Sequence, residues 1–162
     1  MRGLIAYYTK FGNGKRIAEA LARGLEESGQ EVRVLQLPGE VEGDFDFLVV
    51  SSPTRMGRAT GPAKRFVSKL KKGTWAGKPF IAVGTGVHGE EPKGKRSDAW
   101  PAGSADKLYE RLEKAGLKPL MGPQKFWVEN RDDWKNAKLL EGEEDRALEV
   151  GHEIGRMLSA GS

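Results

Sequence analysis

Three glycine-rich segments of this chain carry the residue types that could bind a ligand. The first runs from Thr9 to Gly14 and places a hydroxyl, an amide and two glycines directly before a helical pattern. Glycines allow backbone N–H groups to turn toward an anion, and a helix N-terminus favours a phosphate. The segment is not a Walker loop, because Arg16 stands where that loop has Ser or Thr. A phosphate site and an ordinary tight turn are therefore both open, with Thr9, Lys10, Phe11, Gly12, Asn13 and Gly14 as the candidate residues.

The second and third segments each follow an apolar run that predicts a buried strand. In the second, Ser51 to Gly61, the glycines would allow a flat ligand to approach closely, or would simply connect the strand to the next helix. The third, Gly84 to Gly89, matches G-x-G-x-x-G, but a Pro- and Lys-rich stretch follows it where a dinucleotide-binding loop opens into a helix. We therefore expect its backbone to line a planar ring rather than to bind a dinucleotide.

Short β-rich runs alternate with helical periodicities along the chain, which indicates βαβ units, a parallel sheet and an α/β fold. Ligands bind such sheets outside the carboxyl ends of the strands, where all three segments fall. We expect loops at 53–61 and 85–101, no helix within 38–45, and a helix cap at Ser104. The predicted strands are 3–8, 31–37 (a candidate edge strand), 47–51, 80–84 and an interrupted one within 117–128, and the predicted helices are 15–27, 62–71, 104–115 and 143–158.

Composition narrows the classes of function. The 162 residues fit one domain, 1–162, and the absence of Cys excludes disulfides, thiolate nucleophiles and Cys-ligated metal centres. No apolar run approaches the ~20 residues of a membrane span, and Lys10 comes too early for a signal peptide, so we expect a cytoplasmic protein. The net charge is +4, but no nucleic-acid motif accompanies the basic residues, so no nucleic-acid partner is expected.

The stretch from Tyr7 to Gly14 resembles the phosphate loop of the flavodoxin family. Phe45 to Gly57 resembles the Pro-Thr-Arg-aromatic-Gly loop of flavodoxin-like NAD(P)H:quinone oxidoreductases, and Trp75 to Lys78 is similar to the same group. The resemblance covers nearly the whole chain and implies an open five-stranded parallel sheet, order 2-1-3-4-5, with helices on both faces. It also implies one bound FMN, with the phosphate on Thr9, Lys10, Phe11, Gly12, Asn13 and Gly14, one side of the ring on Pro53, Thr54, Arg55, Met56 and Gly57, and the other side on Thr85, Gly86, Val87 and Gly89.

The sequence also departs from the family in ways that bear on function. Gly14 stands where many members have a phosphate-binding Thr, and Met56 replaces the aromatic residue of the second loop. The insertion that helps the quinone reductases to tetramerise is absent, whereas the pI of about 9.3 is unlike that of the acidic shuttle flavodoxins. We expect an FMN-binding electron-transfer protein, with an FMN-dependent NAD(P)H:quinone oxidoreductase and an interaction module without flavin as alternatives. The expected partner is a redox protein, or a quinone with NAD(P)H, and the expected state is a monomer or a small homo-oligomer.

Several further residues have both a functional and a structural interpretation. His88 or Trp100 could contact the flavin, and Trp75 could do so from a second subunit, although we favour packing at a helix-to-strand turn for Trp75. His152 lacks the H-E-x-x-H spacing, and neither a metal ligand nor a catalytic side chain is expected. The acidic stretch 132–133 predicts a solvated loop, and the acidic stretch 143–145 predicts an acidic helix start. An anionic partner, a pyridine nucleotide phosphate or a merely solvated face could explain the basic group of Arg55, Arg58, Lys64, Arg65, Lys69, Lys71, Lys72, Lys93, Lys95 and Arg96.

Overall fold

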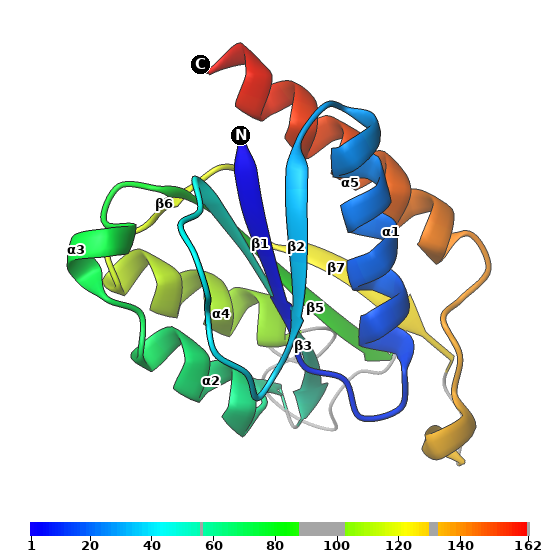
Figure 1. Ribbon diagram of the computed structural model, residues 1–162. Coiled ribbons are helices and arrows are strands. Elements are labelled where there is room, and N and C mark those ends of the chain that lie inside the picture. Colours follow the sequence, from blue (N-terminus) through cyan, green and yellow to red (C-terminus); the bar gives the residue numbers. More distant parts are fainter. Residues whose placement is uncertain (56, 88–102, 130–132, 162) are drawn as a thin grey trace.

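A parallel sheet runs through the centre of the molecule, with helices on both of its faces (Figure 1). This computed structural model describes residues 1–55, 57–87, 103–129 and 133–161. Its strands are β1 (Arg2–Tyr7), β2 (Glu31–Gln36), β3 (Phe47–Arg55), β4 (Arg58–Ala59), β5 (Pro79–Val87), β6 (Lys118–Pro119) and β7 (Gln124–Val128). The order across the sheet is β2-β1-β3-β5, after which β6 and β7 both pair with β5. Since β6 and β7 are the two halves of the predicted interrupted strand, the predicted order 2-1-3-4-5 is confirmed.

The helices divide between the two faces of the sheet. One face carries α1 (Asn13–Glu27) and α5 (Glu143–Ala160), and the other carries α2 (Gly61–Ser68), the one-turn α3 (Lys72–Trp75) and α4 (Gly103–Lys114). A short 3₁₀ turn, η2 (Trp134–Asn136), precedes α5. The predicted arrangement of helices on both faces is therefore confirmed.

The central strand β3 is covered by helices on both faces, which accounts for the continuous apolar run at its start. Phe47 and Val49 enter the core beneath α1 and α5, while Leu48 and Val50 enter the core beneath α2 and α4. All four side chains are fully buried, as a parallel strand covered on both faces requires. The edge strand β2, in contrast, is largely exposed, which confirms the predicted edge position.

Glycines allow α1 and α5 to pack unusually closely. A Cβ at Gly24 would lie 2.3 Å from the carbonyl oxygen of Leu148, and one at Gly151 would lie 2.5 Å from that of Leu21. Neither position can hold a side chain unless the two backbones separate. This contact fixes α5 against α1 and, through it, the start of α5 near the loop that precedes α1.

Several predicted boundaries are wrong. Residues 53–55 and 85–87 are strand rather than loop, because Pro53 pairs with Thr85 and Val87 pairs with Val128 across the sheet. Residues 58–59 form β4 instead of continuing a loop, and the predicted helix 62–71 ends at Ser68, where the Lys69 N–H bonds the carbonyls of both Arg65 and Phe66.

The prediction of no helix within 38–45 is confirmed. None of the helices in the described ranges is both long and apolar enough to cross a lipid bilayer.

Candidate functional site

The three glycine-rich segments come together at the carboxyl edge of the sheet, along the lower side of Figure 1. Tyr7 at the end of β1 pairs with Ser51 of β3, and Pro53 of β3 pairs with Thr85 of β5. The segment after β1 therefore lies beside the ends of β3 and β5, as the sequence predicts.

The segment after β1 has the geometry of an anion-binding loop. Gly12 adopts a left-handed conformation with a φ of +96°, and a Cβ there would meet no atom within 4 Å. The Gly12 N–H donates to Oγ1 of Thr9 at 3.0 Å, so the Thr9 hydroxyl keeps its own proton for another acceptor. The first amides of α1 have no carbonyl partner within the helix, and no acidic residue or side-chain cap occupies its first turn in the described structure. The loop can therefore offer a hydroxyl and helix amides to a phosphate.

Gly14 and Asn13, in the first turn of α1, pack and hydrogen-bond next to this loop. A Cβ at Gly14 would lie 3.0 Å from the carbonyl oxygen of Tyr8 and 3.3 Å from Cβ of Thr9, so the buried position has little room for a Thr. The side-chain amide of Asn13 donates to the carbonyl oxygen of Ala137 at 2.8 Å, which ties the loop to the segment before α5. One N–H of the Asn13 side chain is therefore used within the protein, while the backbone N–H of Asn13 lies at the start of α1, where a phosphate would be bound.

A buried hydroxyl also lies at this end of the sheet. Ser51 is completely buried, and its Oγ has no hydrogen-bond partner in the described structure. Strand alternation places it on the α1 side, in line with Phe47 and Val49. A buried unsatisfied hydroxyl is rare in native proteins, so Ser51 is a polar group available beneath the loop.

The second segment forms a hairpin that is held on α4 by hydroxyl groups. Thr54 and Arg55 of β3 pair with Ala59 and Arg58 of β4, and Gly57 in the turn has a φ of +76°. Oγ1 of Thr54 donates to Oγ of Ser104 at 2.8 Å. The Ser104 hydroxyl in turn donates to the carbonyl oxygen of Ser52 at 2.8 Å, so Ser104 does not act as the predicted cap. The Thr54 side chain is therefore turned toward α4, whereas Arg55 is exposed and Met56 lies outside the described residues.

The third segment extends β5 to the same edge. Thr85 is buried, and Gly86 and Val87 are half-buried beside β7. A Cβ at Gly84 would lie 2.4 Å from Oγ of Ser104, so this glycine permits close packing of α4 on β5. Because 84–87 is strand, these residues do not form the turn of a dinucleotide-binding loop. His88, Gly89 and Trp100 lie outside the described residues.

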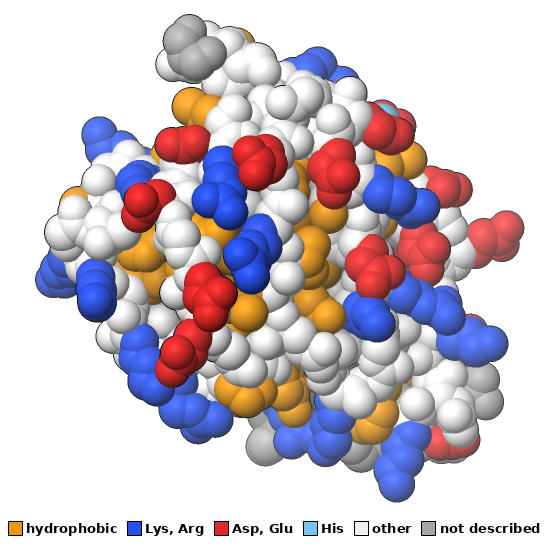
Figure 2. Space-filling view, in the orientation of Figure 1, with side chains coloured by type: hydrophobic (Ala, Val, Ile, Leu, Met, Phe, Trp, Pro, Cys, Tyr) orange, Lys and Arg blue, Asp and Glu red, His pale blue; other side chains and the backbone are white. Residues whose placement is uncertain are grey.

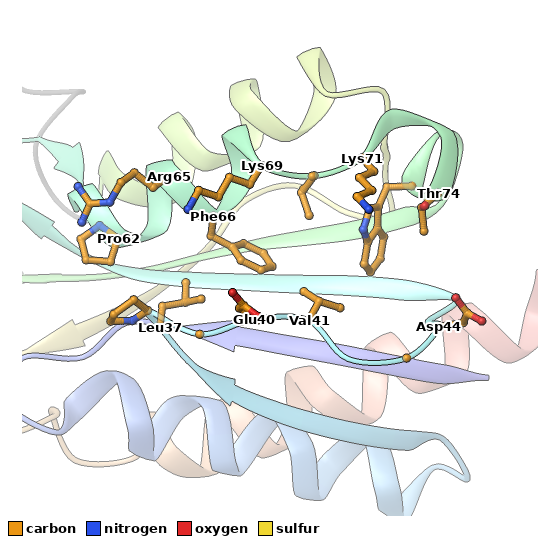
Figure 3. Close-up of a pocket in the computed structure, with 15 residues that line it drawn as sticks. Leu37, Glu40, Val41, Asp44, Pro62, Arg65, Phe66, Lys69, Lys71 and Thr74 are labelled. Carbon is orange, nitrogen blue, oxygen red and sulfur yellow. The ribbon is translucent and has the colours of Figure 1, made fainter.

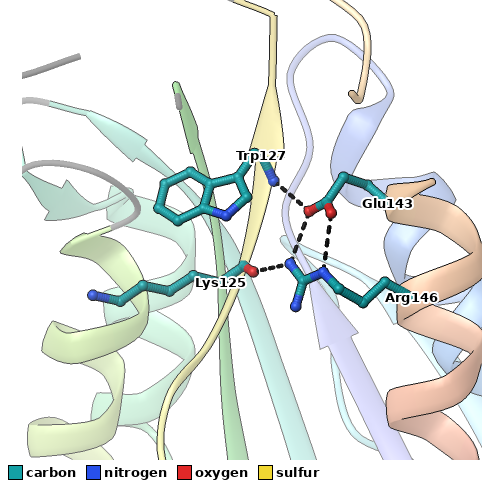
Figure 4. A network of polar contacts seen from close by, with 4 residues as sticks. All are labelled: Lys125, Trp127, Glu143 and Arg146. Carbon is teal, nitrogen blue, oxygen red and sulfur yellow. Dashed lines mark hydrogen bonds and ion pairs between the residues drawn. The ribbon is translucent and has the colours of Figure 1, made fainter. Parts of the chain in front are cut away.

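Glu143, in the predicted acidic helix start, and Arg146, which was not singled out from the sequence, form a network of polar contacts between α5 and β7 (Figure 4). The Glu143 carboxylate accepts the backbone N–H of Trp127 at 2.8 Å, and Nε and Nη2 of Arg146 at 3.0 and 2.8 Å. Arg146 also donates to the carbonyl oxygen of Lys125 and lies over the ring of Phe126, 4.3 Å from its centroid. The i,i+3 spacing predicts the Glu–Arg pair, but no sequence signal predicts β7 as its partner.

The remaining candidate side chains have structural partners. Trp75 is buried at the amino end of β5 and stacks on Phe45 at a centroid distance of 6.5 Å, which agrees with the favoured packing interpretation. His152 contacts Glu27 at 3.1 Å and Glu149 at 3.4 Å, and no cluster that could hold a metal occurs in the described ranges. Burial, together with the nearby charge of Glu19, raises the pKa of Tyr7 above its ordinary value, so this side chain stays neutral at physiological pH.

The open sheet of order 2-1-3-4-5, with a glycine-containing loop between β1 and the N-terminus of α1, defines a flavodoxin-like class of protein. The chain belongs to the flavodoxin family, whose profile matches residues 5–151. An archaeal flavodoxin of known structure shares the fold with a TM-score of 0.76 and 17% identity, covering 98% of this chain and 99% of that chain.

Two curated relatives point in different functional directions. The NAD(P)H dehydrogenase (quinone) of Paracoccus denitrificans is 26% identical over 120 residues, which cover 54% of this chain and 57% of that protein. The flavodoxin of Aquifex aeolicus is 36% identical over 76 residues, which cover 44% of this chain and 41% of that protein. The matches thus span about half the length of these relatives or less.

Proposed function

We propose that this chain, as a single domain 1–162, binds one FMN non-covalently and transfers electrons. The family membership supports FMN as the cofactor. The observation that carries the proposal is the loop at 9–14, where a left-handed Gly12 turns the chain so that the Thr9 hydroxyl and the amides that begin α1 can donate to one phosphate. FMN, when bound, supplies the electron-accepting ring, and the protein sets its orientation and potential.

The proposed contacts follow from the three segments at the sheet edge. The 5′-phosphate is held by donors from Thr9 to Gly14, with Asn13 contributing through its backbone, and the buried Ser51 hydroxyl lies at the same end of the sheet. Pro53 to Gly57, in the hairpin held by Ser104, lines one side of the ring. Thr85, Gly86, Val87 and Gly89 line the other side. Because the hairpin is hydrogen-bonded to α4, its side of the proposed site is preorganised before the cofactor binds.

Flavin titration tests this proposal. Apoprotein is titrated with FMN and with FAD while the quenching of flavin fluorescence is recorded. FMN is expected to bind more tightly, because the described loop offers donors for a single terminal phosphate. No binding of either flavin would support the interaction module without flavin, and equal or tighter binding of FAD would contradict the single-phosphate site.

Two glycine substitutions provide a matched comparison within this test. Gly12→Val and Gly29→Val replace residues at opposite ends of α1, with φ values of +96° and +90° and no atom within 4 Å of the new Cβ. Both variants carry a similar backbone strain of about 1–2 kcal/mol. Only Gly12→Val is expected to weaken FMN binding, with a dissociation constant that rises about tenfold or more. If both variants bind FMN like the wild type while circular dichroism shows them folded, the loop does not hold the phosphate.

An NAD(P)H:quinone oxidoreductase is the second candidate function. The Pro53–Gly57 motif favours it, as does the similarity to the Paracoccus denitrificans protein. Steady-state oxidation of NADPH by the FMN-loaded protein, with a soluble quinone as acceptor, separates the two candidates. Turnover that requires both NADPH and quinone would identify the reductase, whereas flavin that accepts electrons only from a protein donor would identify the carrier.

A further inference from the structure

The charges of this chain are strongly segregated along the sequence. Residues 47–89 contain eight of the 27 Lys and Arg residues and none of the 23 Asp and Glu residues. The rest of the chain therefore carries 19 cations against 23 anions, so its net charge is negative. A basic pI for the whole protein thus arises from one continuous segment, which contains β3, β4, α2, α3 and β5.

The fold gathers this segment's cations into one surface that begins at the candidate cofactor site. Figure 2 shows Lys and Arg side chains along the lower left rim of the molecule, over α2 and α3 in Figure 1. None of these cations forms an ion pair with a described residue, whereas Arg16, on the other face of the sheet, pairs with Glu144 at 3.6 Å. We call the exposed members the basic surface: Arg55, Arg58, Arg65, Lys69, Lys71 and Lys72.

A groove of about 610 Å³ runs along the basic surface, between the segment 37–44 and the helices α2 and α3 (Figure 3). Arg65, Lys69 and Lys71 lie along its helical wall, and Phe66 extends between the two walls. Glu40 and Asp44 come from the opposite wall, but neither reaches a cation of the basic surface within ion-pair distance. The groove therefore combines unpaired cations, an apolar centre and two carboxylates.

We propose that the basic surface is the docking site of an acidic one-electron carrier protein, an inference that rests on the proposed electron-transfer function. Unpaired cations on one face attract a partner of opposite charge and orient it before contact. Arg55 and Arg58 pair with each other in the β3–β4 hairpin, the segment proposed to line the flavin ring, so a partner bound there lies beside the proposed edge of the flavin. One electron then passes from the partner, which is oxidised, to the flavin, which is reduced.

The groove favours a protein partner over a polyanion. Nucleic acid presents a continuous row of phosphates, which Glu40 and Asp44 would repel along the second wall. A protein surface with separate carboxylates and apolar side chains matches both the cations and the apolar centre of the groove.

Binding to an acidic [2Fe–2S] ferredoxin, used as the probe, tests the proposal. Isothermal titration calorimetry is run with protein of known FMN content at low and at high salt. The double variant Lys69→Glu/Lys71→Glu is compared with Arg23→Glu/Arg156→Glu, which makes the same charge change at exposed positions on α1 and α5. We expect the first pair to weaken binding roughly tenfold or more at low salt and the second pair to change it far less.

The outcomes separate this proposal from the proposed function. Equal effects of the two pairs, or no salt-dependent binding by FMN-loaded protein, would overturn the docking site and leave the FMN proposal intact. Salt-dependent, site-specific binding by protein that takes up no FMN would instead overturn the electron-transfer function. A double-stranded DNA fragment that binds more tightly than the ferredoxin, with the same sensitivity to Lys69→Glu/Lys71→Glu, would show that the surface is a nucleic-acid site and would refute the proposal.

Discussion

The carboxylate of Glu143 is expected to be one of the most important polar groups for the stability of this domain. In Glu143→Ala the backbone N–H of Trp127 loses the carboxylate that accepts it at 2.8 Å, and the loss of this charged acceptor costs about 1–3 kcal/mol. The Arg146 ion pair adds up to about 1 kcal/mol, because the Arg146 side chain is 40% exposed and solvent screens its charge. Removal of a carboxylate from the first turn of α5 adds about 0.3–1 kcal/mol. We therefore expect the free energy of unfolding to fall by about 2–4 kcal/mol.

Urea unfolding followed by circular dichroism measures this loss. Glu144→Ala is the matched control, since Glu144 lies in the same helical turn but is about half exposed and makes only a 3.6 Å contact with Arg16; its loss should stay below about 1 kcal/mol. Glu143→Gln keeps one acceptor for the Trp127 N–H and should fall between the two. Hydrogen exchange of the Trp127 amide should quicken in Glu143→Ala only. Equal losses in Glu143→Ala and Glu144→Ala would refute the assignment of this carboxylate to β7.

Three further predictions concern charge, pH and packing. Arg55→Glu should lower the reduction potential of the bound flavin by about 30 mV, as expected for a screened charge within a Debye length of ~10 Å. A redox titration measures this potential, and the absence of a shift would place Arg55 away from the ring. Burial holds the pKa of Tyr7 above 10.0, so the tyrosine of the unfolded chain ionises first and the free energy of unfolding falls as the pH rises above about 10. In urea titrations, the free energy of unfolding of Tyr7→Phe should fall less than that of the wild type above this pH, and the two should match at pH 8. Gly24→Ala should cost about 1–3 kcal/mol or more in thermal unfolding, because its Cβ would lie 2.3 Å from the Leu148 carbonyl, whereas Gly73→Ala, which meets no atom within 4 Å, should cost nothing measurable.

The architecture of this protein could be predicted from sequence because strands and helices are indicated by the periodicity of nearby apolar residues. The apolar run from Phe47 to Val50 predicts a strand buried on both faces, and the alternation of such runs with helical patterns indicates a parallel sheet. In such a sheet the carboxyl ends of the strands share one edge, so the three glycine-rich segments had to meet there. The family resemblance, carried by the segments around Gly12 and Pro53, is confirmed by the match over residues 5–151.

Tertiary structure decided which way the polar side chains of the site turn. Asn13 and Thr54 both read as ligand contacts in the sequence, yet their side chains bond to Ala137 and Ser104, which are distant in the chain. The last residues of β3 and β5 are strand only because a neighbouring strand supplies their hydrogen bonds. Glu143 belongs to the acidic helix start that the sequence predicts, but only the structure shows that its side chain is buried against β7. Such partners depend on the path of the whole chain, whereas periodicity reports only on nearby residues.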